Sequence, residues 1–542
     1  MKKILLFTLA WMLALTSCMS TSAQPAVTPT TPAKPPSLPN VEEKPSVPTA
    51  TALPDTKHQP TRTPSSYGPT REDFPDNINP LTGQPVTDPA QLSEPALLLS
   101  VPHFPAVARP QAGISFAPWV FEFLIAEGTT RFLAVFYGEI PYQETPITGD
   151  CEVRSEPFVQ IDLILGNFIW HDNNQNGVQD VGERGIGGVC VRLLDDKGSI
   201  LHETSSDSNG YYGFNAPANT PVKIEVVLPP NMKFTQPDVG YEELDSDIDP
   251  STGRSTLHIL DADERALDVG LVLSEDVLEK RDEIEPTFGE QVGPVRSGRL
   301  VYIPIHDFMQ YSCLIYAGAT EKIKKLLPQC ATVYGEGDGA GGFLDIERME
   351  RISAENAEGF HSDFNYASNL FSETPPEDGV PAVELDIYTS LLNQSKWVYD
   401  PLHQGYLRYV DDVSENPTFH PEIDRLTGRE LLFQNVILLE AEHEVWAPRI
   451  IEMHLEQGLA GAATLFRDGQ KFDILWDTRA TEYEKTSGKR NPIRFTDMDG
   501  NPIALRPGHT WIFIITPYSV LKPSGETAWR LRVYSPEGAG EY

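Results

Sequence analysis

Apolar and polar positions follow two different patterns along this chain of 542 residues. In the first pattern, short apolar runs typical of strands occur together with segments of helical periodicity, as expected of a mixed α/β domain. The predicted strands are ALLLSV at 96–101, RFLAVFYG at 131–138 and SCLIYAG at 312–318, and the predicted helices are APWVFEFLIAEG at 117–128, which is amphipathic, and PIHDF at 304–308. These elements lie in two segments, 76–150 and 285–410, which we expect to form one mixed α/β host domain.

The second pattern occurs between these two segments, from residue 157 to residue 275. Its apolar runs are short and β-branched or aromatic, and they are separated by turn sequences such as DDKGS and SDSNGYYGF. This pattern predicts an all-β sandwich that interrupts the host. After residue 425 strand-like runs return, and the pairs Asp468-Gly469 and Asp499-Gly500 predict hairpin turns between them. Residues 425–542 are therefore expected to form a β-rich α+β C-terminal domain.

The N-terminus predicts export and an anchor. Two lysines precede an apolar run at 4–15, which is too short to cross a bilayer and is typical of a signal peptide over residues 1–18. The sequence LTSC resembles the lipobox of bacterial lipoproteins, which implies that Cys18 is lipidated. The alternative is an ordinary signal peptide with a chance cysteine. Residues 19–75 are rich in Pro and Thr and predict a disordered stalk.

Charge narrows the range of partners. With 78 acidic and 42 basic residues, the chain has a formal charge of −36. Nucleic acid is excluded as a partner because its phosphates require a surplus of Lys and Arg. The expected partners are the membrane, through the lipid anchor, and a cell-wall polymer or an envelope protein. The expected location is extracytoplasmic, at the cell surface or the periplasmic face of the cell membrane.

The stretch HDNNQNGVQDVGE, residues 171–183, predicts a calcium site. It matches the calcium-loop pattern D-x-[DN]-x-[DN]-G-x5-E at every fixed position. Calcium prefers oxygen ligands, and Gly177 permits the sharp turn that such a loop needs. The alternative is a plain polar turn. The expected ligands are the side chains of Asp172, Asn174, Asn176, Asp180 and Glu183 and the carbonyl group of Val178.

The remaining cysteines are candidates for two disulfides. Cys151, Cys190, Cys313 and Cys330 would lie in an oxidising compartment, and four thiols allow three pairings. Cys313 and Cys330 flank a short strand-plus-helix pattern and are one candidate bridge, and Cys151 with Cys190 is the matching candidate. Buried free thiols are the alternative.

The sandwich region also resembles a known family. Its motifs GNFIWHDNNQNGVQDVGERGIGGVCVRLLD, SSDSNGYYGFNAP, DSDIDPSTGRS and ALDVGLV are similar to the SdrD B-like repeat of bacterial surface proteins, a relative of the collagen-adhesin B-type module. The resemblance covers residues 165–273 and implies a calcium-rigidified β-sandwich that acts as a spacer. It also implies a second calcium site at Asp245, Asp247 and Asp249.

The host resembles the YerB-like lipoprotein family, whose domains have no known function. The motifs are NPLTGQPV, ARPQAGISFAPWVFEFLIAEGTTRFLAVF and VGPVRSGR, followed near the C-terminus by GAATLFRDGQKFDILWDTR and PIRFTDMDGNPIALRPGHTWIFII. One departure is visible at residues 368–371. The sequence there is SNLF where the family is expected to carry His-Asn-Leu-Tyr, which weakens a catalytic interpretation of this position.

Three arginines suggest an anionic ligand. Arg296 and Arg299 lie in the glycine-containing sequence GPVRSGR, and Arg109 lies in VARPQ. Guanidinium groups suit carboxylate or phosphate ligands, such as those of a wall polymer. The alternative is that these arginines pair with the many carboxylates of the chain.

Two classes of function follow. The first is a binding or structural protein of the cell envelope, with calcium as its cofactor. The alternative is a hydrolase or transferase acting on a wall polymer, with Glu122 or Asp363 as the reactive carboxylate. The sequence shows no recognisable catalytic nucleophile with an accompanying general base. Two weaker motifs are present. GDGAGG at 337–342 resembles a dinucleotide-binding motif, but a loop is favoured. EHEVWAPRIIEMH at 442–454 offers residues that could bind zinc, but a plain strand and helix are favoured.

Overall fold

The computed structural model describes residues 65–126, 128–274, 290–328, 330–332, 342–359, 364–414 and 416–539. The predicted signal peptide, Cys18 and most of the predicted stalk lie outside the described residues. Asp363 and most of the GDGAGG motif lie outside them as well. No helix among the described residues is long and apolar enough to span a membrane.

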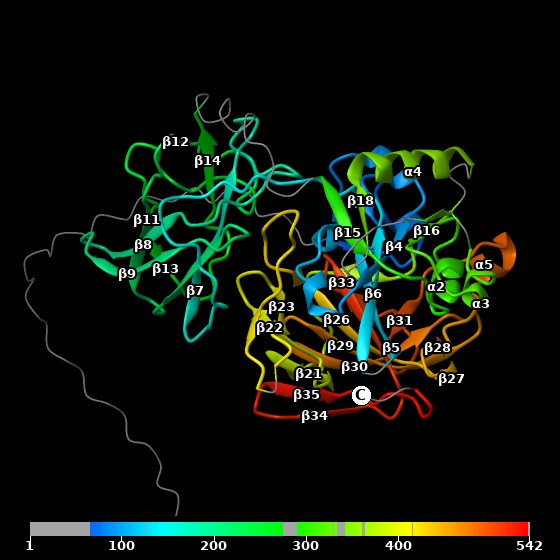
Figure 1. Cartoon of the computed structure of the whole chain (residues 1–542). Helices are drawn as coiled ribbons and strands as arrows, with labels where there is room; N and C mark the ends of the chain where they lie inside the picture. Colours follow the sequence, from blue (N-terminus) through cyan, green and yellow to red (C-terminus); the bar gives the residue numbers. More distant parts are fainter. Residues whose placement is uncertain are drawn as a thin grey trace, which may run out of the picture. The chain divides into compact units, whose positions relative to one another are not determined.

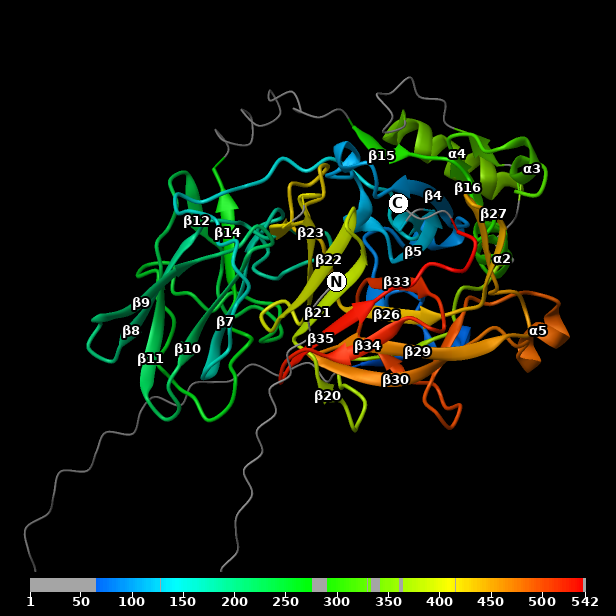
Figure 2. The same ribbon diagram turned by 60° about the horizontal axis from the view of Figure 1, so that its bottom comes forward.

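An 11-stranded sheet forms the centre of the host (Figure 1). It takes strands from both predicted host segments and from the predicted C-terminal domain. Figure 2 shows β33, β26, β29 and β30 side by side. The order is β17 (Ala331–Thr332), β16 (Cys313–Tyr316), β4 (Leu97–Pro102), β6 (Thr129–Phe136), β5 (Trp119–Ala126), β33 (Thr510–Ile515), β26 (Asn435–Glu440), β29 (Ala460–Arg467), β30 (Gln470–Asp477) and β20 (Val380–Pro381), with β31 (Arg494–Thr496) paired to β30.

A seven-stranded sheet completes the host core. The host core is one hydrophobic cluster that includes Phe74 and Ala539, so its three segments fold together. The seven strands are β24 (Phe419–Pro421), β23 (Gly405–Asp411), β22 (Asn393–Asp400), β21 (Glu384–Ser390), β35 (Ala528–Arg532), β34 (Val520–Pro523) and β25 (Leu432–Phe433).

Short elements surround these sheets. The small strands are β1 (Ser66–Tyr67), β19 (Leu370–Ser372), β32 (Ala504–Leu505), β2 (Ile78–Asn79), β3 (Gln84–Pro85), β15 (Gln291–Val295), β18 (Gly342–Asp345), β27 (His443–Ala447) and β28 (Ile450–Met453). The helices are α2 (Tyr302–Phe308), α3 (Glu321–Lys324), α4 (Ile346–Gly359) and α5 (Glu482–Ser487), with 3-10 turns η1 (Arg71–Asp73), η2 (Pro89–Ser93), η3 (Ala106–Ala108) and η4 (Ile114–Phe116).

The inserted segment is a sandwich of two four-stranded sheets with a hydrophobic core of its own. This arrangement, inside a strand-rich host, confirms the expected fold class. The first sheet has the order β10 (Tyr211–Ala216), β7 (Leu163–His171), β14 (Val269–Leu273) and β12 (Met232–Phe234), and the second has the order β13 (His258–Ile259), β11 (Pro221–Val226), β8 (Cys190–Asp195) and β9 (Ile200–Ser205).

Both candidate disulfides are present. Cys151 is bonded to Cys190, which ties the segment before the sandwich to β8, and Cys313 is bonded to Cys330. The predicted strands at 96–101, 131–138 and 312–318 and the helix at 304–308 correspond to β4, β6, β16 and α2.

Three expectations are wrong. Residues 117–128 contain strand β5 instead of an amphipathic helix, because the strand lies inside the central sheet and is buried on both faces. The stalk ends earlier than residue 75, since β1 pairs with β19 and Phe74 is buried. Residues 443–453 form the hairpin of β27 and β28 with no helix.

A buried polar cluster joins the sandwich to the host. His403 of the host lies 2.7 Å from Asp207 of the sandwich, measured from Nε2 to Oδ2. Arg154 donates to the same oxygen at 2.6 Å, and the His403 ring lies 4.3 Å from the ring of Tyr211. Burial alone would lower the pKa of His403 and raise that of Asp207, but their mutual attraction reverses both shifts.

Candidate functional site

The predicted calcium loop is closed at its base by the sandwich itself. Strand β7 delivers the chain to Asp172, and a bridge between Trp170 and Gly185 brings the far end of the loop back to β7. The Ile186 amide also donates to the carbonyl of Ile169 at 2.8 Å. The local sequence therefore folds into a compact loop instead of an open turn.

The predicted ligand side chains converge inside this loop. Asp172 is fully buried, and its carboxylate accepts from the amides of Asn176 at 3.2 Å and Gly177 at 2.9 Å. The side-chain amides of Asn174 and Asn176 both donate to Oδ2 of Asp180 at 2.7 Å. Hydrogen bonds thus link four of the predicted positions into one chain.

Glu183 closes the loop. One of its carboxylate oxygens accepts from the amide of Asn173 at 2.8 Å and the other from the amide of Asp180 at 3.0 Å. Burial raises the pKa of Glu183, and the negative charge of Asp172 acts in the same direction. Gly177 has a φ of 83°, and a Cβ there would lie 2.6 Å from the carbonyl oxygen of Gln236. A glycine is therefore required at the centre of the loop.

A second group of carboxylates lies next to the loop, where Asp245 bridges to Val178. Asp245 and Asp268 are buried, and within the described residues one oxygen of each lacks a hydrogen-bond partner. Burial and neighbouring acidic groups raise the pKa of Asp245 to about 6 and that of Asp247 to about 9. The pKa of Asp268 is also raised, by burial and by Asp247.

This second group differs from the set that the resemblance implies. Asp249 is exposed, and hydrogen bonds from Ser251 lower its pKa. Asp268 takes its place beside Asp247, whose Oδ2 accepts from the Asp268 amide at 2.6 Å. Asp268 lies in the motif ALDVGLV, but nothing in that motif marks it as a partner of residues about twenty positions earlier.

The chemistry of these groups fits calcium. All of the side-chain groups offer carboxylate or amide oxygens, which are the ligands that calcium prefers. Across the described ranges, no three His, Cys, Asp or Glu side chains are grouped closely enough to hold a metal. An ion in the loop would therefore also need the amide oxygens of Asn174 and Asn176 and the carbonyl group of Val178.

The three predicted arginines separate into two groups. Arg109 is neutralised by Asp411, since Nη1 and Oδ1 lie 2.9 Å apart. Arg296 and Arg299 have no ion-pair partner among the described residues, and Arg131, which the sequence reasoning missed, lies beside them. Arg131 stands inside the apolar run of β6, where no local motif marks it.

Glu122, the carboxylate considered for catalysis, is part of the host core. Its oxygens accept from the Thr130 hydroxyl at 2.7 Å and from the Trp511 ring nitrogen at 3.0 Å. Arg408 lies 3.6 Å away and is fully buried. With 2% of its surface exposed, Glu122 is satisfied by its neighbours and is closed to a polymer substrate.

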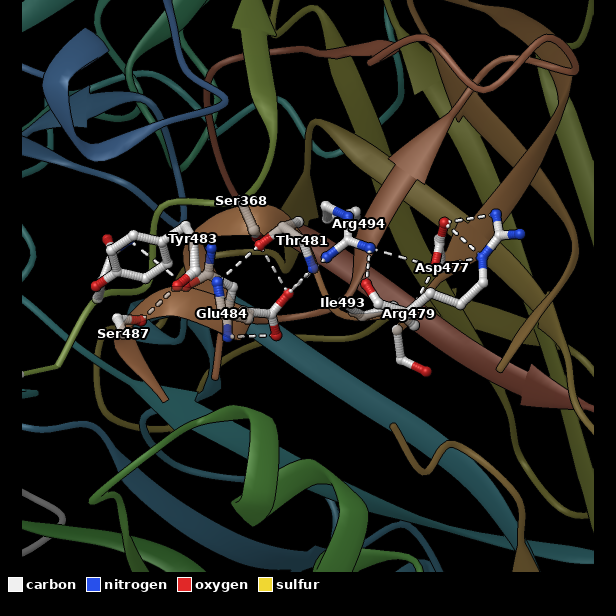
Figure 3. A network of polar contacts seen from close by, with 12 residues as sticks. Ser368, Asp477, Arg479, Thr481, Tyr483, Glu484, Ser487, Ile493 and Arg494 are labelled. Carbon is white, nitrogen blue, oxygen red and sulfur yellow. Dashed lines mark hydrogen bonds and ion pairs between the residues drawn. The ribbon is translucent and has the colours of Figure 1, made fainter. Parts of the chain in front are cut away.

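Figure 3 shows a polar network beside Ser368, where the family is expected to carry His. Arg494 contacts Glu484 and Asp477, each at 3.2 Å, and Arg479 contacts Asp477 at 2.7 Å. Opposite charges balance within this network, which is therefore explained as a structural one.

The zinc interpretation of residues 442–454 gains nothing from the hairpin. The ring of His443 hydrogen bonds to the carbonyl of Ala441 at 2.7 Å, and that of His454 to the carboxylate of Glu456 at 3.1 Å. The two histidines thus have separate partners.

Comparisons with known proteins agree with both resemblances. The family model of the SdrD B-like domain matches residues 163–271. The models of the N-terminal and C-terminal domains of DUF3048, a protein of unknown function, match residues 81–180 and 385–512. An SdrD B-like domain thus stands between two DUF3048 regions.

Individual relatives match in part. Serine-aspartate repeat-containing proteins C and D of Staphylococcus aureus (strain Newman) are 39% and 38% identical over 107 residues, which is 20% of this chain. The chain spans only 11% and 8% of the lengths of these two relatives. Among solved structures, the YerB protein from Bacillus subtilis aligns with a TM-score of 0.42 and 16% identity, over 81% of this chain and 96% of that chain.

Proposed function

From the presence of an SdrD B-like domain between two DUF3048 regions, we propose that this chain is an extracytoplasmic, lipid-anchored protein with a structural or binding role in the cell envelope, and that calcium stabilises its sandwich. The observation that carries the proposal is the closed loop at 172–183, whose oxygens converge around the buried Asp172. The two disulfides support an oxidising compartment.

Calcium binding is tested by titrating the chelator-treated full chain with calcium in a calorimeter. Saturable binding is expected, and Asp172→Asn should weaken it at least tenfold because a buried charged ligand is lost. Glu203→Gln is the matched control, since Glu203 is an exposed carboxylate on β9 of the same sandwich. Equal binding by both variants would refute the assignment of the loop.

The anchor is tested by membrane fractionation of cells that express the chain. Cys18→Ser should move the protein from the membrane fraction to the soluble fraction, whereas Ser20→Ala should not. If both variants stay in the membrane fraction, the lipid anchor at Cys18 is wrong.

The envelope role is tested by sedimenting the full chain with purified cell-wall sacculi, with calcium and with chelator. Retention without released fragments is the expected result for a binding protein. Release of wall fragments would overturn it in favour of a hydrolase, for which the buried Glu122 offers no support.

A further inference from the structure

Three arginines meet at one edge of β4. Arg131 on β6 is in register with Pro102 of β4, and its Nη1 donates to the carbonyl of Ser297 at 3.1 Å. The amide of Arg296 donates to the carbonyl of Ser100 at 2.8 Å, which fixes the segment 296–299 against the same strand. Strand pairing therefore brings a buried arginine of one host segment to two arginines of the other.

The positive charge at this point has no counter-charge among the described residues. Arg131 is 3% exposed, and Arg296 and Arg299 are half-buried. In the part of the chain that the structure describes, no carboxylate lies within ion-pair distance of any of the three, and each Nε lacks a hydrogen-bond partner. The contacts that exist are to neutral groups, such as the carbonyl of Arg449, 3.2 Å from Nη1 of Arg299.

The nearby phenol does not offset this charge. Tyr302 lies 2.6 Å from Ser100, measured between hydroxyl oxygens, and burial raises its pKa, so it remains neutral. Burial lowers the pKa of Arg131 to about 9, and the positive charges of Arg299 and Arg296 add to this shift, although Tyr302 opposes it. The positive charges of the three guanidinium groups thus repel one another.

Such an arrangement is unfavourable unless an anion binds to it. Burying a charge without a partner costs free energy of folding. Arginines with a structural role normally form ion pairs with carboxylates, as Arg479 and Arg494 do in Figure 3. The guanidinium group presents a planar fork of donors that fits the oxygens of a phosphate group.

We propose that Arg131, Arg296 and Arg299 form a binding site for a phosphate group, with Arg131 as its floor and the two half-buried arginines at its rim. Phosphate is favoured over a single carboxylate because it carries more than one negative charge and enough oxygens for three guanidinium groups. This inference goes beyond the proposed function and does not depend on calcium.

The test is a titration of the full chain with inorganic phosphate at constant ionic strength, followed by calorimetry. We expect saturable binding that Arg296→Gln and Arg299→Gln each weaken about tenfold or more, since each removes a charge-assisted contact. Arg530→Gln, which removes the same charge from the exposed surface of β35, should leave binding unchanged. Both rim variants change partly exposed side chains, so the test does not rest on Arg131→Gln folding correctly.

Several outcomes would overturn the site. These are no binding of phosphate by the full chain, an equal loss in Arg530→Gln, or binding of acetate as tight as that of phosphate. Competition experiments with vesicles of phosphatidylglycerol and of phosphatidylcholine show whether the phosphate group comes from a lipid headgroup or from a soluble compound. Competition between phosphatidylglycerol vesicles and inorganic phosphate that disappears in Arg299→Gln identifies a lipid headgroup. Phosphate binding that the vesicles do not affect identifies a soluble phosphate ester.

Discussion

The substitution Glu183→Gln should remove most of the calcium-dependent stability of the sandwich. In the wild-type chain, calcium at about 100 times its Kd would stabilise the folded form by about 2.7 kcal/mol. The two oxygens of Glu183 accept from the loop amides of Asn173 and Asp180 at 2.8 and 3.0 Å, so the carboxylate faces into the loop. Glutamine keeps one of these oxygens and loses the charge.

The expected loss follows from that contact. A charged contact contributes about 1.5 to 3 kcal/mol, so the calcium-dependent gain should fall to about 1 kcal/mol or less. For a domain of roughly 100 residues, this corresponds to a calcium-induced rise in Tm that is smaller by roughly 6 to 20 °C. The assay is thermal unfolding, followed by circular dichroism, in calcium and in chelator.

Glu203→Gln provides the comparison, because it removes the same charge from the exposed face of β9. Its calcium-induced rise in Tm should equal that of the wild type. The reasoning is refuted if the two variants respond alike, or if the wild-type melt is the same in calcium and in chelator.

Three further predictions concern stability. Gly177→Ala should weaken calcium binding and lower Tm even in chelator, since φ is 83° and the new Cβ would meet a main-chain oxygen at 2.6 Å; a melt within about 1 °C of wild type would contradict this. The pair of His403 and Asp207 should stabilise the chain most between pH 3.8 and 6.5. Its contribution is lost below that window as pH falls through the lowered pKa of Asp207, and above it as pH rises through the raised pKa of His403; a pH series of urea melts on the wild type and His403→Gln should show their difference peaking inside the window. Arg408→Met should destabilise the host by about 3 to 5 kcal/mol, because it leaves the buried Glu422 unpaired; adding Glu422→Gln should restore part of this in chemical denaturation, and full additivity would count against the pair.

The convergence of the side chains at 172–183 could be predicted from sequence because all of these groups lie within twelve consecutive residues. Local spacing alone determines which of them can converge, and the structure brings Asp172, Asn176 and Asp180 together. Asp268 and Arg131 were missed for the opposite reason. Arg131 reaches its neighbours through the pairing of β6 with β4, and Asp268 reaches Asp247 through hydrogen bonds between separate segments, so no local pattern records either contact.

The same limit explains the error at residues 117–128. The charge of Glu122 inside an apolar run imitates the polar face of a helix. In the structure this run is strand β5, which pairs with β6 on one side and in parallel with β33 on the other. Glu122 is then buried between its neighbours with Thr130 and Trp511 as partners. The apolar pattern identifies burial correctly but cannot distinguish a central strand from a helix.

The closure of the host around its insertion has a mechanical consequence. The chain leaves the host after β6 and returns at β15, and β4 contacts both flanks, through β6 on one side and through the amide of Arg296 on the other. Host hydrogen bonds thus seal the root of the sandwich. A pulling force applied between the two chain ends would act on these hydrogen bonds of the host. The sandwich would carry no load while they hold. A module connected in this way does not lengthen a tether, and its stiffness would instead matter for what its outer loops can reach.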